Sequence, residues 1–139
     1  MLRILVADDY EIVRRGLKQI LVEAFPEIHV EEAIDTPDLI DKALNDRWDF
    51  IITDIIMPGG NGLEAMKKIK AQMASLPVLI ISTYPEDQYT SHAINAGADG
   101  YLSKNTIPEH LITAIQQILS GKKYISKDLL SGPDINQLS

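Results

Sequence analysis

The feature that most constrains the fold of this chain is an alternation, repeated five times, of a short apolar run and a stretch with helical periodicity. The apolar runs cover residues 2–7, 28–32, 50–53, 78–81 and 100–102. Runs that are apolar at almost every position are typical of strands buried on both faces. The second run instead alternates apolar and polar residues, which is typical of a half-exposed strand near a sheet edge.

Helical stretches follow the runs, with apolar residues at spacings of three and four. The fourth stretch, around residues 89–96, has the thinnest apolar face. The boundary signals are an N-cap and first-turn proline at Thr36–Pro37, capping boxes at Asn61/Glu64 and Thr106/Glu109, and a C-cap at Gly121. Five strand–helix pairs predict an α/β fold with a parallel sheet, because parallel strands need crossover connections.

Length and composition fit one compact domain. The chain has 139 residues, 45% of them hydrophobic, and a net charge of −7. That charge argues against nucleic-acid binding by this chain, because phosphate contacts need clustered basic residues. There is no cysteine for a disulfide or a thiolate metal site, and no apolar run approaches membrane-spanning length. Because the chain starts without a secretory signal, we expect a cytoplasmic location and no membrane contact.

Polar residues with reactive or metal-binding groups follow four of the predicted strands. Asp8 and Asp9 end the first apolar run, Asp54 the third and Ser82 the fourth, and Lys104 closes the fifth. In open parallel sheets, ligands bind at the carboxyl ends of the strands, where the strand order switches. We therefore expect these five residues to meet at one edge of the sheet.

These residue types together predict a divalent-cation and phosphoryl site. Clustered carboxylates repel one another unless a cation lies between them, and Mg²⁺ prefers oxygen ligands. Lys104 adds a mobile positive charge, and Ser82 adds a hydroxyl donor. A carboxylate such as Asp54 can attack phosphorus to form an acyl phosphate.

The same motifs give the chain a family resemblance. They are VADD at 6–9, DIIMPGGNG at 54–62, IST at 81–83, AGADGYLSK at 96–104 and GKKYIS at 121–126. Together they resemble the receiver domain of two-component response regulators, and the last two stretches resemble its NarL/FixJ (LuxR-type) subfamily. The resemblance implies a flavodoxin-like (βα)5 three-layer sandwich with strand order 2-1-3-4-5. It also implies a receiver domain over residues 1–121.

The resemblance further implies what lies beyond the receiver. Residues 122–139, with little periodicity, are expected to be a linker or tail leading to an absent helix-turn-helix output domain. A natural single-domain receiver is the alternative. DNA would be contacted only through the absent domain, and phosphorylation could promote a homodimer. The other partner implied is a cognate histidine kinase.

The family pattern assigns a role to each site residue. The expected roles are phosphoacceptor for Asp54, Mg²⁺ ligands for Asp8, Asp9, Asp54 and the backbone carbonyl of Ile56, phosphoryl contacts for Lys104 and Ser82, and switch residues for Ser82 and Tyr101. On phosphorylation, Ser82 is expected to move towards the phosphoryl group and Tyr101 to turn inward. A Tyr101 that is already sequestered in the unphosphorylated protein would oppose this model.

Two features depart from the commonest receiver pattern. Asn105 follows Lys104 where many receivers have a proline, often cis. Ile56 and Tyr84, two residues beyond Asp54 and Ser82, are bulky and largely apolar. In the family these two positions influence how water reaches the acyl phosphate. We therefore hypothesise slow self-dephosphorylation.

Two other functions share this set of residues. A Mg²⁺-dependent phosphohydrolase would also use an aspartyl nucleophile, but Ile56 stands where its acid/base aspartate is usual, so we do not expect a turnover enzyme. A phosphate-independent interaction module would not need the acids and Lys104. At the residue level, Asp8 could cap the first helix, and Tyr101 could simply pack against the core.

Overall fold

The main sheet of the computed structural model, which describes residues 2–83 and 92–125, is wholly parallel. Its strands are β1 (Arg3–Ala7), β2 (His29–Ala33), β3 (Phe50–Asp54), β6 (Val78–Ser82), β7 (Gly100–Ser103) and β8 (Tyr124–Ile125). They lie in the order β2-β1-β3-β6-β7-β8. The first five strands reproduce the predicted order 2-1-3-4-5, with the half-exposed β2 at the edge, and β8 adds a sixth.

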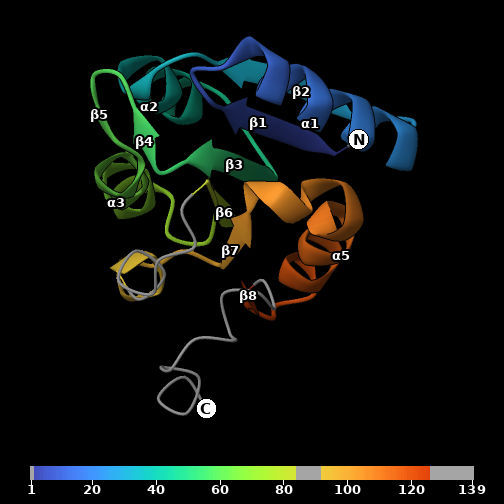
Figure 1. Ribbon diagram of the computed structural model, residues 1–139. Helices are drawn as coiled ribbons and strands as arrows, with labels where there is room; N and C mark the ends of the chain where they lie inside the picture. The colour runs from blue at the N-terminus through green and yellow to red at the C-terminus, as the bar shows by residue number, and fades with distance from the viewer. Residues whose placement is uncertain (1, 84–91, 126–139) are drawn as a thin grey trace.

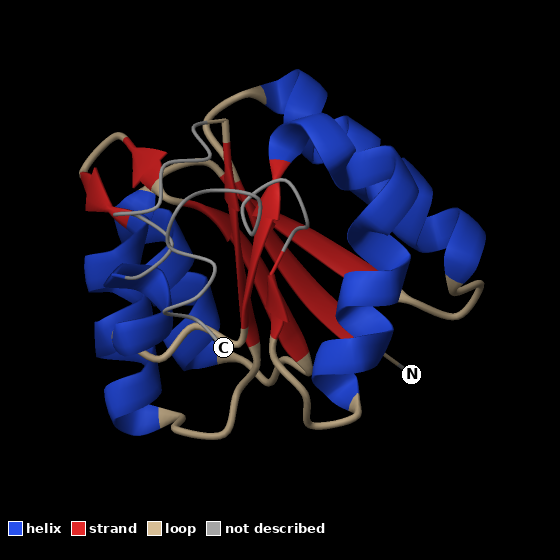
Figure 2. Cartoon of the chain, turned by 60° about the horizontal axis from the view of Figure 1, so that its bottom comes forward, coloured by secondary structure: helices blue, strands red, loops and turns tan. Residues whose placement is uncertain are grey.

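Helices cover both faces of this sheet, so the molecule has three layers (Figures 1 and 2). They are α1 (Glu11–Ala24), α2 (Thr36–Asn45), α3 (Gly62–Gln72) and α5 (Ile107–Leu119), with the 3-10 turn η1 (Lys104–Thr106) before α5. Residues 92–95 are also helical and belong to the predicted fourth helix. The first part of that helix, with Tyr89, lies outside the described residues. No helix within the described ranges is long and apolar enough to cross a bilayer.

Two hydrophobic clusters form the core, one on each side of the sheet. Phe50 and Ile52 of β3 pack with α1 and α5, whereas Ile51 packs with α2 and α3. This alternation follows from the period of two in a strand. Because both faces are covered, all five residues of β3 are buried, as its apolar run predicts.

The helix boundaries differ from the predicted ones in detail. The N-cap of α2 is Asp35 rather than Thr36, and its carboxylate accepts the Asp38 N–H at 2.8 Å. Asn61 caps α3 as predicted, through its side-chain oxygen. Thr106 precedes α5 but makes no side-chain capping hydrogen bond, and its hydroxyl donates to the carbonyl of Ser103. The predicted N-cap of α2 was one residue too far along the chain, because Asp35 and Thr36 are both of residue types that make good N-caps.

A small hairpin follows Asp54, where the sequence has three glycines within four residues. Strand β4 (Ile56–Met57) pairs antiparallel with β5 (Gly60–Asn61). Gly59 and Gly60 make the turn with φ values of +83° and +141°, which favour glycine. Gly62 then begins α3, and a side-chain carbon there would collide with the backbone carbonyl of Asp54. The glycines therefore bring the chain back against the end of β3.

Strand β8 corrects the expectation that regular structure ends at Gly121. Tyr124 and Ile125 pair with Gly100 and Tyr101 of β7. A side-chain carbon on Gly100 would lie 2.9 Å from the carbonyl oxygen of Tyr124, so the missing side chain lets the two strands approach. Two residues are too few to carry a strand periodicity, which is why the pairing could not be read from the sequence.

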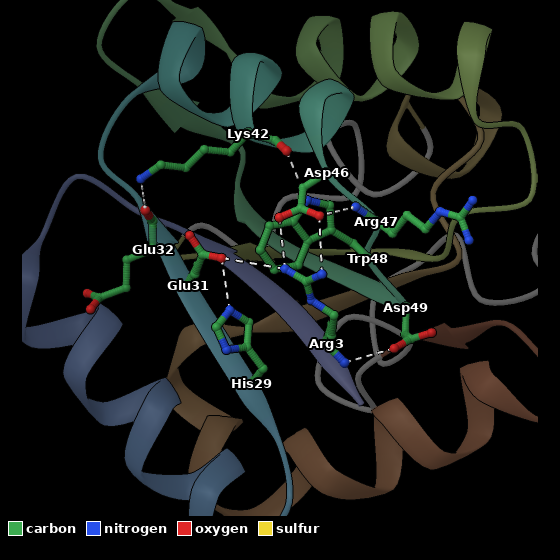
Figure 3. A network of polar contacts seen from close by, with 9 residues as sticks. All are labelled: Arg3, His29, Glu31, Glu32, Lys42, Asp46, Arg47, Trp48 and Asp49. Carbon is green, nitrogen blue, oxygen red and sulfur yellow. Dashed lines mark hydrogen bonds and ion pairs between the residues drawn. The ribbon is translucent and has the colours of Figure 1, made fainter. Parts of the chain in front are cut away.

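A polar network surrounds Arg3 at the amino end of β1, away from the carboxyl ends of the strands (Figure 3). Its guanidinium donates to both carboxylate oxygens of Asp46, at 3.1 and 2.9 Å. The same group lies 4.9 Å from the centre of the Trp48 ring, on which the His29 ring stacks. The network therefore joins β1 and β2 to the segment that follows α2.

Candidate functional site

The sheet brings the predicted site residues together at one edge. The register pairs Asp54 with Ile81 of β6, and Ser82 with Ser103 of β7. Because neighbouring strands end at the same level, the residues at or just past their carboxyl ends share this edge. The residues predicted from the strand ends therefore lie near one another in the structure.

Three carboxylates form the acidic half of the site. Asp8, Asp9 and Asp54 each offer an oxygen within 4.8 Å of the other two. Asp8 and Asp54 are buried, and Asp9 is exposed. Asp8 does not cap α1: its Oδ1 accepts the N–H of Tyr10, which is itself the N-cap residue. Its carboxylate therefore stays directed at the site.

Lys104 supplies the positive charge. Its Nζ lies 2.7 Å from Oδ2 of Asp8 and 3.1 Å from Oδ2 of Asp54. Burial alone would lower the pKa of Lys104, but the hydrogen bond to Asp8 and the charge of Asp54 outweigh it, so the pKa lies above its usual value. The ammonium is therefore charged throughout the physiological pH range.

The environment of Asp54 makes its charge costly. Burial raises the pKa of this carboxyl; the charge of Lys104 opposes the rise, and the charge of Asp8 adds to it. The net pKa lies above the ordinary value of 3.8. The other oxygen, Oδ1, accepts the N–H of Ile55 at 2.8 Å. A buried, poorly solvated carboxylate of this kind is available as a nucleophile or as a cation ligand.

The residues present fit a hard divalent cation. All three side chains offer carboxylate oxygens, the ligands that such a cation prefers, and exposed Asp9 leaves room for bound water. Lys104 already compensates part of the negative charge by its ion pairs with Asp8 and Asp54. The acidic cluster could therefore bind a metal ion, which would add to the charge compensation.

A cleft of about 200 Å³ opens over these groups. Its lining residues are Asp9, Tyr10, Asp54, Ile55, Ile56, Ser82, Thr83 and Lys104. A larger hollow of about 690 Å³ lies at the amino ends of the strands beside Arg3 and Trp48. Size alone would favour that hollow as the functional site, but the carboxylates and the lysine converge in the smaller cleft.

The remaining predicted residues divide into three cases. Ser82 is buried at the end of β6 and lines the cleft. Ile56 also lines it, with 53% of its surface exposed, while Tyr84 lies outside the described residues. Tyr101 is fully buried and packs in the core cluster on the α2 and α3 side of the sheet. This conformation gives no support to an inward turn from an exposed position.

Two residues of the site were missed from the sequence. The Tyr10 ring lies 5.8 Å from Nζ of Lys104, and Arg14 donates to the backbone carbonyl of Asp8 at 2.8 Å. Arg14 also pairs with Glu32 of β2, so it ties the acidic loop to the edge strand. The available signal was an aromatic residue directly after the acid pair and an arginine one helical turn later.

Comparison with known proteins places these residues in a family. The protein-family model for the response regulator receiver domain matches residues 4–116 of this chain. Response regulator UvrY of Escherichia coli K12 is 32% identical over 138 residues. That alignment covers 99% of this chain but 63% of UvrY, so the chain spans less than two thirds of this relative.

Solved structures agree with this result. A two-component response regulator of the LuxR family from Aurantimonas sp. SI85-9A1 superposes with a TM-score of 0.88 at 30% identity, covering 99% of this chain and 98% of that one. The RcsB response regulator of Salmonella typhimurium, described for its conformational dynamism in DNA interaction, gives 0.81 at 26% identity. That match covers 99% of this chain and 66% of RcsB.

Proposed function

Since the chain belongs to the response regulator receiver domain family and is similar to its LuxR-type members, we propose that it is a phosphorylation switch whose phosphoacceptor is Asp54. The observation that carries this proposal is the buried Asp54 carboxylate beside the Lys104 ammonium, at a cleft that also contains Ser82. The phosphoryl donor is a histidine kinase, and we expect the exchange to take place in the cytoplasm.

The chemistry of the transfer follows from these groups. A carboxylate oxygen of Asp54 attacks the phosphorus of a phosphohistidine on the kinase. The new P–O bond forms as the P–N bond breaks, and the electron pair of that bond leaves with the histidine nitrogen, which takes up a proton. Lys104 neutralises charge on the phosphoryl oxygens, and Ser82 donates a hydrogen bond to one of them.

We assign the metal site to Mg²⁺. Asp8, Asp9 and Asp54, with the backbone carbonyl of Ile56, would hold the ion. When bound, Mg²⁺ would supply positive charge to the phosphoryl oxygens and so assist both formation and hydrolysis of the acyl phosphate. The protein contributes positioning and charge to a single covalent exchange, and we therefore propose a switch that acts on itself rather than a turnover enzyme.

The output of the switch is the less direct part of the proposal. We assign residues 1–121 to the receiver and residues 122–139, which include β8 on the edge of the receiver sheet, to the start of a connection towards a helix-turn-helix domain. Two observations support this assignment. UvrY and RcsB are longer than this chain, and the RcsB structure is described in terms of DNA interaction. DNA binding would belong to that further domain, and dimerisation on phosphorylation would be one route to it.

Tyr101 keeps a smaller role in this account. It is fully buried and is paired with Ile125 of β8. A shift in the position of β7 would therefore also move β8 and the segment that follows it. The buried Tyr101 opposes the expected inward turn, so Tyr101 remains a proposed switch residue only through this pairing with β8. Ser82, which lines the cleft, keeps its proposed switch role. A phosphate-independent interaction module is the alternative, and it would leave the close Lys104–Asp54 pair without a use.

Binding of beryllofluoride tests the proposed acceptor without relying on the lifetime of a phosphoryl group. Fluorine NMR of the protein with Mg²⁺, beryllium and fluoride is expected to show bound resonances for the wild-type chain. They should vanish when Mg²⁺ is omitted and in Asp54→Asn. Bound resonances that persist in Asp54→Asn would move the acceptor elsewhere, and their absence from folded wild-type protein would favour the phosphate-independent module.

A further inference from the structure

Tyr10 is an aromatic residue that lines the cleft beside Asp54 and Lys104. It is 61% exposed, yet its ring centre lies 5.8 Å from Nζ of Lys104. The ring also lines the same cleft as Asp54 and Ser82. An ammonium within about 6 Å of an aromatic centre is attracted by the electrons of the ring face.

The residue type is not explained by the start of α1. Tyr10 occupies the N-cap position, where Ser, Thr, Asp and Asn are preferred, and its side chain makes no capping hydrogen bond. It is not explained by the core either, because most of the side chain is exposed. A local choice that helps neither the helix nor the packing is expected at functional positions.

We propose that Tyr10 is a positioning residue for phosphoryl transfer, whose ring holds the Lys104 ammonium over Asp54. This inference rests on the proposed function, and it adds a residue outside the acidic set. Two carboxylates already attract the ammonium, at 2.7 Å for Asp8 and 3.1 Å for Asp54. The Tyr10 ring, 5.8 Å from the ammonium, is a further attractive group on the lining of the same cleft.

The ring matters most once Asp54 carries a phosphoryl group. Lys104 would then pair with phosphoryl oxygens in the cleft that Tyr10 also lines. A flexible, strongly hydrated ammonium loses geometry in water, whereas a ring face limits both its motion and its hydration. Tyr10 would therefore favour the position of Lys104 in which transfer is completed.

Matched variants separate the ring from its bulk and its hydroxyl. Tyr10→Phe keeps the ring, and Tyr10→Leu keeps an apolar side chain without one. Both retain the backbone N–H that donates to Asp8, and the exposed position makes unfolding unexpected. With Mg²⁺ and acetyl phosphate, the rate of phosphorylation of the folded protein, followed by intact mass, is expected to fall about two- to fivefold in Tyr10→Leu. Tyr10→Phe should stay close to the wild type.

A rate for Tyr10→Leu equal to the wild-type rate would overturn the proposal, and so would a Tyr10→Phe variant as slow as Tyr10→Leu. Proton NMR of the Lys104 ε-methylene gives a second reading that does not depend on phosphorylation. The ring should shift these protons upfield in the wild type and in Tyr10→Phe, but not in Tyr10→Leu. If the wild type formed no adduct, the proposed function would fail, while the NMR shift would still decide whether the ring holds Lys104.

Discussion

Asp54 is the residue on which stability and function compete most directly. Its carboxylate is buried, and its neighbour Asp8 carries the same charge, so the ionised form is disfavoured. Lys104 compensates this only in part, since the net pKa of Asp54 remains above its ordinary value. A group whose pKa is raised by folding costs stability when the pH keeps it ionised. The ionised carboxylate of Asp54 therefore lowers the stability of the folded protein at neutral pH.

Replacing that charge is expected to stabilise the protein. Asp54→Asn keeps the shape of the side chain and should raise the free energy of unfolding at neutral pH by roughly 0.5–2 kcal/mol, the common range for relieving a functional site. Urea unfolding at pH 7 measures the change. Asp9→Asn, at an exposed acid, is the control and should change less. An Asp54→Asn variant less stable than the wild type would mean that the Lys104 pair outweighs the cost of burial.

Ile56 carries a second prediction at the residue scale. Its exposed apolar side chain lines the cleft beside Asp54 and offers no hydrogen bond to an attacking water. Ile56→Asn should therefore speed hydrolysis of the acyl phosphate by roughly tenfold, less than a positioned general base provides. The decay of the phosphorylated mass after removal of the donor gives the rate. Ile56→Val should match the wild type, and equal lifetimes for Asn and Val would sink the hypothesis of slow self-dephosphorylation.

Among the secondary-structure elements, the hairpin β4–β5 and the start of α3 depend on a close backbone approach. A methyl group on Gly62 would meet the carbonyl of Asp54, which cannot move without displacing the site. Gly62→Ala should lower the free energy of unfolding by about 1–3 kcal/mol, as overpacking does. Gly16→Ala, in the exposed middle of α1 with free space around it, should raise it by about 0.5–1 kcal/mol. Chemical denaturation of both variants tests the contrast, which an equal effect of the two would contradict.

The Arg3 network at the other edge predicts a dependence on pH. A hydrogen bond from Arg3 lowers the pKa of Asp46 below its ordinary value of 3.8. A carboxyl whose pKa is lowered by folding contributes stability above its unfolded pKa and loses it as the pH falls through the folded pKa. Asp46→Asn should therefore lower the melting temperature at pH 7, and the difference should shrink as the pH falls below 3.8. Glu27→Gln controls for the loss of one exposed charge, and a pH-independent difference would contradict this account.

The sequence predicted elements better where a pattern extends over several residues. Strands such as β3 and helices such as α1 were predicted from repeated apolar spacing. The two-residue strands β4, β5 and β8 are too short to carry a strand periodicity. Strand β8 also depends on pairing with the distant β7. The sequence left two readings of Tyr101 open, core packing and an exposed switch, because its burial depends on strands and helices far apart in the sequence.

For the whole molecule, the parallel sheet explains why the candidate site could be predicted as a set. Its neighbouring strands end in register, so Asp54, Ser82 and Lys104 meet although they are distant in sequence. The contact of Tyr10 with Lys104 depends instead on how α1 starts above the sheet, which strand patterns do not report. The site residues at strand ends were therefore predictable, whereas Tyr10 and Arg14, which lie beside them on the segment that begins α1, were not.

The central claim is that Asp54 accepts a phosphoryl group, and intact mass tests it most directly. The folded chain would be incubated with Mg²⁺ and acetyl phosphate beside Asp54→Asn and a sample without Mg²⁺. We expect one added phosphoryl group on the wild-type chain with Mg²⁺ and none in either control. An equal adduct on Asp54→Asn would contradict this claim. So would folded wild-type protein that forms no adduct and also binds Mg²⁺ and beryllofluoride weakly or not at all.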